Sequence, residues 1–292
     1  MAALDRYFDD PRYLFEFGDY HGHISFNVRE EEKDKYRERD DVFLQTFGLG
    51  YENHEDRVVV VYLRYLSSLS SDHQLYWSTY ELDSERCRMC EDYYRNTIEA
   101  EWTIGGSLYV AFIEEQKIIN QMCSAIGWPH FFRKTFEDKR PKEFSLFVRP
   151  TKKHFHEFVH TVDKMLSDNI NADFFPPWIS RTKFSRIRGV DAPRERGTLS
   201  MFEEWLKRSI RTDEGAYDHV INPLKKVREM RRHPAHAISD VEYDKKYYEL
   251  QDTLLEDAYG SLRTFRLLLA NHPEARRVEV PNWLFEAKFR RY

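Results

Sequence analysis

The residues best suited to phosphate chemistry lie between positions 225 and 236. This stretch reads Lys-Lys-Val-Arg-Glu-Met-Arg-Arg-His-Pro-Ala-His and holds five cationic side chains against one anionic side chain. A guanidinium binds a phosphate through parallel hydrogen bonds and stabilises developing negative charge. An imidazole titrates near neutral pH and moves protons to and from hydroxyl groups. An arginine and a histidine held by one rigid turn therefore suit cleavage of an RNA backbone.

The segment from Arg231 to His236 resembles the Arg-x4-His motif of the HEPN superfamily. It also lies where that family places the motif, late in one helix and before another long helix. HEPN domains are all-helical and usually dimeric, and many are metal-independent ribonucleases of bacterial toxin–antitoxin, abortive-infection and CRISPR systems. Other members do not cut RNA and act in binding or assembly. The resemblance covers roughly the last 95 residues, and the chain departs from the family's usual form at Arg232 and at Pro234.

Residue by residue, the resemblance implies that Arg231 contacts the phosphate and that His236 is the general acid or base, with no cofactor. The neighbouring side chains expected to bind RNA are Lys225, Lys226, Arg228, Arg232 and His233. Two alternatives stay open. Arg228 and His233 have the same spacing as Arg231 and His236. The cations also suit the C-terminal end of a helix, whose dipole favours positive charge, without any ligand. Pro234 predicts that this helix ends near His233.

A second candidate site is the sequence His156-Glu157-Phe158-Val159-His160, which matches the H-E-x-x-H pattern of zinc hydrolases. Two histidines four residues apart on a helix share a face and could bind one zinc ion. A third ligand is not evident, because no glutamate occurs between Glu157 and Glu195. A zinc hydrolase using His156 and His160 is therefore kept as an alternative.

Composition limits the class of protein. The 292 residues carry a formal charge of −5, yet residues 1–60 hold 8 basic and 15 acidic side chains, whereas residues 181–292 hold 23 basic and 18 acidic ones. The longest apolar run, Val58–Leu63, is too short to cross a bilayer, and the three cysteines form no even set for disulfides. These features predict a cytoplasmic protein without a membrane segment, with a basic C-terminal part able to meet a polyanion.

Hydrophobic periodicity predicts the elements that position these residues. In residues 1–175 alternating apolar residues indicate two hairpins, 13–28 and 42–65, and helical spacing indicates helices over 73–80, 110–126 and from 152 to about 166. A short strand is expected over 144–148. Residues 176–197 are predicted to be a basic, proline-containing linker or ordered arm. Residues 198–292 are predicted to be a helical bundle with helices over 198–211, 218–232 and 241–271.

The sequence thus predicts an α+β N-terminal domain that recognises an unidentified ligand or protein, followed by an all-α, HEPN-like C-terminal domain. The leading hypothesis is an antiviral or toxin-type endoribonuclease of bacterial defence, with RNA as partner and a homodimer formed through the helical domain. The alternative from another class is a non-catalytic dimerisation or sensor module.

Overall fold

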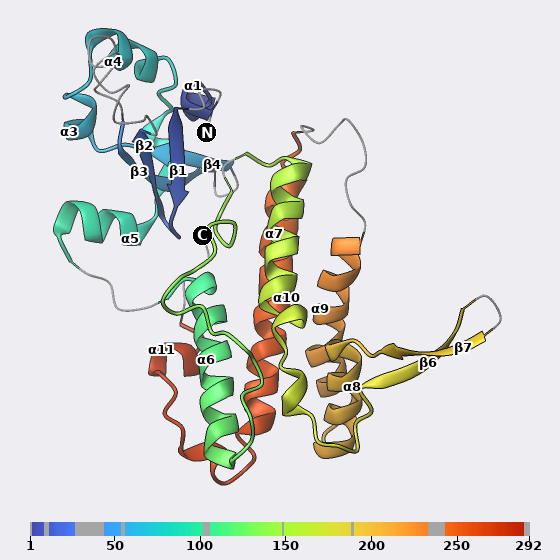
Figure 1. Cartoon of the computed structure of the whole chain (residues 1–292). Coiled ribbons are helices and arrows are strands. Elements are labelled where there is room, and N and C mark those ends of the chain that lie inside the picture. Colours follow the sequence, from blue (N-terminus) through green and yellow to red (C-terminus); the bar gives the residue numbers. More distant parts are fainter. Residues whose placement is uncertain are drawn as a thin grey trace, which may run out of the picture. The chain divides into compact units, whose positions relative to one another are not determined.

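The structure is a computed structural model of the chain, and it describes residues 2–8, 12–26, 44–53, 56–101, 106–147, 149–187, 190–232 and 243–288. The chain forms two compact units (Figure 1). The N-terminal unit comprises Met1–Ile104, Ser145–Arg149 and Tyr292, and the helical unit comprises Gly105–Phe144 and Pro150–Arg291.

An antiparallel sheet organises the N-terminal unit. Its strands are β1 (Tyr13–Phe17), β2 (His21–Phe26), β3 (Thr46–Glu52), β4 (Asp56–Val60) and β5 (Cys87–Met89), in the order β1-β2-β3-β4 with β5 paired to β3. Short helices accompany the sheet: α1 (Asp5–Phe8), α3 (Leu63–Leu66), α4 (Ser71–Ser78) and α5 (Glu91–Tyr94). Both predicted hairpins are present, although the second ends at Val60 because the chain then turns into α3.

Glycines in β3 allow close packing on this sheet. A Cβ added at Gly48 would lie 2.3 Å from the ring of Tyr93, and one added at Gly50 would lie 2.5 Å from the carbonyl oxygen of Arg88 on β5. Tyr93 is 2% exposed and follows β5 directly, in α5. The absent side chains therefore let β5 and α5 pack against the strand.

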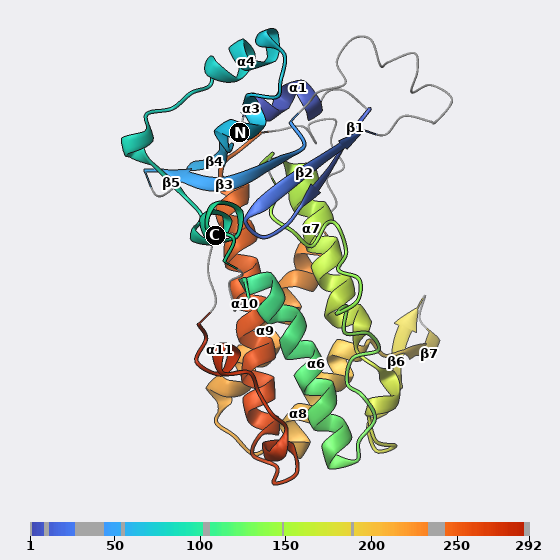
Figure 2. The ribbon, with the colours of Figure 1, turned by 90° about the vertical axis from the view of Figure 1, so that its left-hand side faces the viewer.

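The helical unit is built from long helices that pack side by side (Figure 2). They are α6 (Leu108–Ile126), α7 (Lys152–Met165), α8 (Thr198–Ser209), α9 (Glu214–Arg232) and α10 (Lys246–Leu269), with the short α11 (Asn282–Phe285) near the end. Ser107 and Thr151 are the N-caps of α6 and α7. The side-chain oxygen of each accepts a hydrogen bond from the backbone N–H three residues later.

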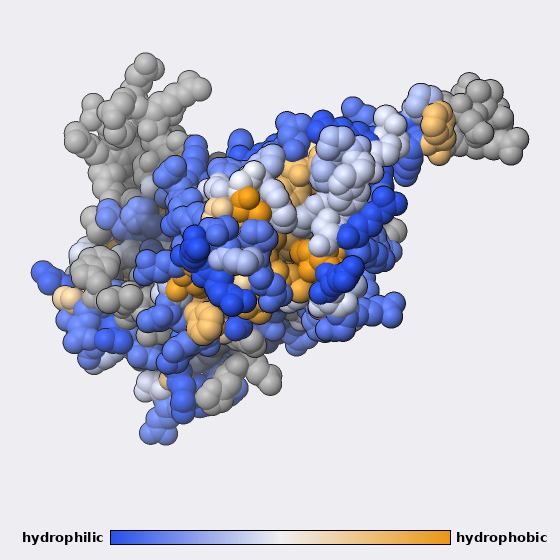
Figure 3. Space-filling view, turned by 90° about the horizontal axis from the view of Figure 1, so that it is seen from below, coloured by the Kyte–Doolittle hydropathy of each residue, from blue (hydrophilic) through white to orange (hydrophobic). Residues whose placement is uncertain are grey.

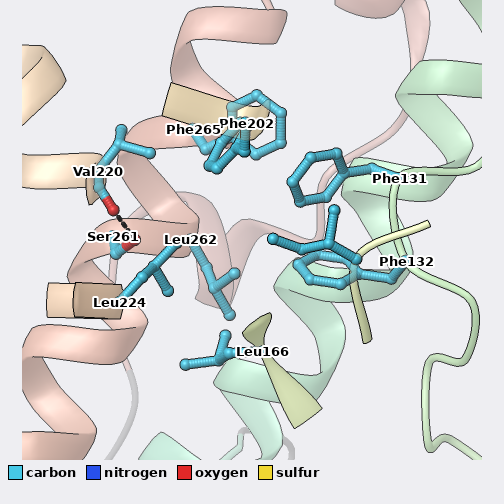
Figure 4. Close-up of a pocket in the computed structure, with 10 residues that line it drawn as sticks. Phe131, Phe132, Leu166, Phe202, Val220, Leu224, Ser261, Leu262 and Phe265 are labelled. Atoms are coloured by element: carbon cyan, nitrogen blue, oxygen red, sulfur yellow. Dashed lines mark hydrogen bonds between the residues drawn. The ribbon is translucent and has the colours of Figure 1, made fainter. Parts of the chain in front are cut away.

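Aromatic side chains fill the core where these helices meet. Phe131 lies 4.7 Å from Phe202 and 4.8 Å from Phe265, measured between ring centroids. A cavity of about 10 Å³ remains among these residues (Figure 4). That volume is at the lower limit for one water molecule, so the cavity is a packing gap and not a ligand site.

A buried ion pair crosses the same bundle. Arg266 Nε of α10 donates a 2.6 Å hydrogen bond to Glu115 Oε2 of α6, and the two side chains are 2% and 0% exposed. Burial raises the pKa of Glu115, against the opposing effect of the guanidinium. Removing one partner of such a pair is strongly destabilising, because the other charge stays buried without a counter-charge.

The division into units differs from the predicted boundary at residue 175. Helices α6 and α7 were assigned to the α+β domain, but α6 packs on α10 and α7 packs on α9, so both belong to the helical unit. The expected strand over 144–148 is absent from its described residues, which are irregular with Phe144 and Leu146 buried. An antiparallel sheet region followed by a helical region is nevertheless what the sequence predicted in outline.

Of the two alternatives predicted for residues 176–197, a linker or an ordered arm, the described residues agree with the ordered arm. Residues 176–197 contain an antiparallel hairpin of β6 (Thr182–Ile187) and β7 (Val190–Glu195). Alternating apolar residues do not mark these strands, and the side chains described in them, at positions 182–184 and 193–195, are exposed.

Among the helices that the structure describes, none combines the length and the apolar character that crossing a membrane requires.

Candidate functional site

Helix α9 carries most of the residues predicted to contact RNA. Those within it are Lys225, Lys226, Arg228, Arg231 and Arg232. His233 and His236 lie outside the residues that the structure describes. The site can therefore be built from the arginines and their neighbours.

Two of these arginines meet two aspartates, in what we call the Arg–Asp cluster (Asp163, Asp168, Arg228 and Arg231). Arg228 Nη1 donates to Asp163 Oδ2 at 2.8 Å and to Asp168 Oδ1 at 2.5 Å. Arg231 Nη1 donates to Asp163 Oδ2 at 2.5 Å and also to Asp168 Oδ2. Each guanidinium thus uses one nitrogen to bridge both carboxylates.

Helix spacing explains why these side chains converge. Arg228 and Arg231 are three residues apart on α9 and so share one face. Asp163 is on α7, which packs against α9, and Asp168 is in the 3-10 turn Ser167–Asn169 just after α7. The cluster therefore joins the end of α9 to the end of α7.

Burial differs sharply within the Arg–Asp cluster. The Asp163 side chain is fully buried, at 0% exposed, whereas Arg228 and Arg231 are 29% and 30% exposed and Asp168 is 36% exposed. Asp163 Oδ1 has no hydrogen-bond partner within the described part of the chain. A buried carboxylate is tolerated only with cationic partners, so Asp163 requires the arginines.

The electrostatics of the cluster keep Asp168, Arg228 and Arg231 charged near neutral pH. Burial alone would raise the pKa of Asp168, but hydrogen bonds from Arg228 and Arg231 outweigh it and hold that pKa below its ordinary value. Hydrogen bonds to Asp163 and Asp168 raise the pKa of Arg231. For Arg228 burial acts in the opposite direction, and the same two carboxylates still raise its pKa. The cluster thus places two guanidiniums against two carboxyl groups.

The remaining predicted cations on α9 are not part of this cluster. Lys225 Nζ lies 2.7 Å from Glu203 of α8, and Lys226 Nζ lies 2.8 Å from Asp257 of α10, in exposed ion pairs. Arg232 is exposed and makes no ion pair with any residue that the structure describes. The structure therefore brings together Arg228 and Arg231 and sends the two lysines to other helices.

The histidines of the zinc pattern lie on α7. His156 and His160 are half-buried and Glu157 is exposed, but no third His, Cys, Asp or Glu joins them in a metal-binding group among the described residues. His160 lies one turn before Asp163, on the same helix face. Its pKa is lowered by burial and by the positive charges of Lys164 and Arg231, so its imidazole is neutral at pH 7. His160 therefore lies next to the Arg–Asp cluster, on the same face of α7 as Asp163.

Sequence reasoning missed the aspartates that hold the arginines. Neither Asp163 nor Asp168 was predicted from the sequence to pair with the arginines. A signal for Asp163 was present, because it lies four residues after Val159 within the apolar stripe of α7 and is buried with it. A carboxylate at a core position predicts a cationic partner on a facing helix.

No protein-family model, curated protein or solved structure matches the chain. The likeness to the HEPN superfamily therefore depends on the motif residues alone.

Proposed function

We propose that the helical unit binds single-stranded RNA through Arg228 and Arg231 and cleaves it without a metal ion, with His236 as the general acid or base. The observation that carries this proposal is the pair of guanidiniums held side by side at the C-terminal end of α9, immediately before the segment that contains His236.

The Arg–Asp cluster supports phosphate binding through orientation. Both arginines use Nη1 for the carboxylates, and in the described part of the chain their Nε and Nη2 atoms have no hydrogen-bond partner. About 30% of each side chain is exposed. The aspartates fix the planes of the guanidiniums in advance, which lowers the entropy lost when a phosphate binds.

The reaction that suits these groups is attack of the ribose 2′-oxygen on the adjacent phosphorus. A base removes the 2′-hydroxyl proton, the bond from phosphorus to the 5′-oxygen breaks, and an acid returns a proton to that oxygen. The products are a 2′,3′-cyclic phosphate and a 5′-hydroxyl. The arginines stabilise the extra negative charge on the phosphoryl oxygens during this step.

The test is cleavage of a labelled single-stranded RNA in EDTA by the whole chain and by His236→Ala. We expect cyclic-phosphate products from the parent and a loss of about 10²–10⁴-fold in rate from the variant. His219→Ala is the matched control, because His219 also lies on α9, is exposed, and hydrogen-bonds within the described residues to the carbonyl of Gly215 in the preceding turn. Absence of cleavage by the parent, or equal rates for parent and His236→Ala, would refute the proposal.

A second function, a non-catalytic assembly or sensor module, is favoured by the complete burial of Asp163. In that case the Arg–Asp cluster is an ion-pair bridge that fixes α7 to α9. Arg231→Ala would then lower the free energy of unfolding, and the parent would not bind RNA. Light scattering with and without RNA separates the two functions, since only the first predicts a complex.

A further inference from the structure

The hairpin before α8 has more basic than acidic side chains and therefore carries a net positive charge. Residues 181–196, which we call the arm, hold six cationic and two anionic side chains. The arm contains all of β6 and β7, which pair only with each other among the described strands. In the space-filling view the described part of the arm projects from the helical unit on the right (Figure 3).

The root of the arm is fixed by ion pairs. Arg181 lies 3.0 Å from Asp173, and Arg196 pairs with Glu204 of α8. The backbone N–H of Arg196 donates a 2.8 Å hydrogen bond to the Arg181 carbonyl, which closes the base of the hairpin. These two arginines are therefore already occupied.

The next pair along the hairpin has no such partners. Lys183 lies directly opposite Arg194 in the antiparallel register, and both side chains are exposed. Neither makes an ion pair within the described part of the chain. Like charges directly opposite one another destabilise a strand pair, and a two-stranded hairpin is only marginally stable by itself. The arm therefore carries a cost that an anionic partner would remove.

The two faces of the arm differ in charge. Successive residues of a strand point to opposite faces, so Lys183 and Arg194 share one face and Phe184 and Pro193 share the other. The sequence places both anions, Asp191 and Glu195, at positions of the Phe184 face. The face with Lys183 and Arg194 is thus cationic and free of acidic positions.

We propose that the Lys183–Arg194 face of the arm binds the phosphate backbone of single-stranded RNA. A polyanion placed between the two cations neutralises their repulsion and releases counterions, which makes binding favourable and dependent on salt. The choice of RNA rests on the proposed function. The contact itself requires only backbone phosphates and does not depend on cleavage.

The root of the arm lies beside the Arg–Asp cluster. Thr198 Oγ1, two residues past the arm, donates a 2.7 Å hydrogen bond to the carbonyl of Ser167, and Ser167 precedes Asp168. An RNA strand bound along the arm can therefore continue to Arg228 and Arg231 in the Arg–Asp cluster. The arm extends the binding site beyond the nucleotide that would be cut.

The experiment measures binding of a fluorescent 2′-O-methyl RNA to the whole chain as a function of salt. This RNA has no free 2′-hydroxyl and cannot be cut, so a failure of cleavage does not affect the result. Each phosphate contact in a single strand contributes about 0.7 to the slope of log affinity against log salt. Lys183→Gln/Arg194→Gln should therefore reduce the slope by about 1.4.

Two further variants keep the result interpretable. Lys183→Glu creates an opposite-charge pair with Arg194, which favours the hairpin, so its weaker RNA binding cannot come from unfolding of the arm. Arg133→Gln/Lys139→Gln removes the same charge from exposed positions between α6 and α7 and should leave the slope unchanged.

Each outcome decides the proposal. If the parent binds RNA and the arm variants bind it equally well, the arm proposal is wrong and the Arg–Asp cluster proposal stands. If the arm variants lose the slope while natural RNA is not cut, the arm proposal stands and cleavage is wrong. If Phe184→Ala dissociates a dimer in light scattering and the charge variants bind RNA normally, the arm is a contact with a second copy of the chain, which overturns RNA binding by the arm. Phe184 is 75% exposed and provides that comparison.

Discussion

The most informative perturbation of this structure is Asp163→Asn, which removes the charge of the buried carboxylate with little change in shape. Asp163 Oδ2 accepts hydrogen bonds from both Arg228 and Arg231, and the side chain is 0% exposed. Each hydrogen bond to a charged group contributes about 1.5–3 kcal/mol. In this variant both arginines still pair with Asp168, and about 30% of each arginine side chain is exposed to solvent. Neither guanidinium is therefore left buried and unpaired.

We therefore expect Asp163→Asn to lower the free energy of unfolding by about 2–4 kcal/mol. The control is Asp173→Asn, which breaks an Asp–Arg pair at the surface, where Asp173 is 76% exposed and pairs with Arg181. A surface pair of this kind contributes about 0–1 kcal/mol.

Urea unfolding followed by far-ultraviolet circular dichroism measures both variants, because the helical unit contains most of the helix. We expect a lower urea midpoint for Asp163→Asn than for the parent, with the same dependence of the unfolding free energy on denaturant. If Asp163→Asn costs no more than Asp173→Asn, then Asp163 is not a buried anion held by the arginines, and the Arg–Asp cluster does not join α7 to α9.

Three other results are expected. The pKa of Asp168 is held below its ordinary value, so the ionised carboxylate stabilises the fold above pH ~4, and this stability is lost as the pH falls through the lowered pKa. When the free energy of unfolding is measured against pH, Asp168→Asn should lose less stability below pH ~4 than the parent does. Glu115→Leu should destabilise by about 3–5 kcal/mol because it leaves Arg266 buried without its carboxylate, and Glu115→Leu/Arg266→Met should restore much of the loss in the same assay; a double variant less stable than the single one would contradict this. Burial raises the pKa of Cys90 to about 12, so a thiol reagent at pH 8 should label Cys87 before Cys90 in the folded protein, and mass spectrometry finding Cys90 labelled first would show that its burial is wrong.

Local chemistry accounts for the elements that the sequence predicted well. Ser107 and Thr151 each precede a run with helical periodicity, and both are N-caps in the structure. Short-range rules suffice here, because a cap and its amide lie within one turn. The same holds for the hairpins, where alternation and turn residues determine the pairing.

Long-range packing accounts for what was missed. The sequence places α7 and α9 65 residues apart at the Asp163–Arg228 contact, and no local pattern says which helix α7 packs against. The domain boundary was misplaced for the same reason, since α6 and α7 follow strands in the chain yet pack with α9 and α10. The cationic stretch on α9 was recognised from composition, whereas its partners depend on tertiary structure.

The N-terminal unit includes Ser145–Arg149, which Gly105–Phe144 of the helical unit separates from the rest of it along the chain. Within it, Arg57 Nη1 donates a 3.5 Å hydrogen bond to the Phe147 carbonyl, and the guanidinium of Arg149 lies 4.6 Å from the ring centroid of Phe8. Residues 1–104 by themselves are thus an incomplete fold that lacks an internal piece. The segment 145–149 is comparable to a peptide ligand that is covalently linked to its binding site. Its effective concentration at residues 1–104 is set by the connecting residues 105–144. If the chain were cut within residues 105–144, the N-terminal unit would have to form by association of two separate fragments.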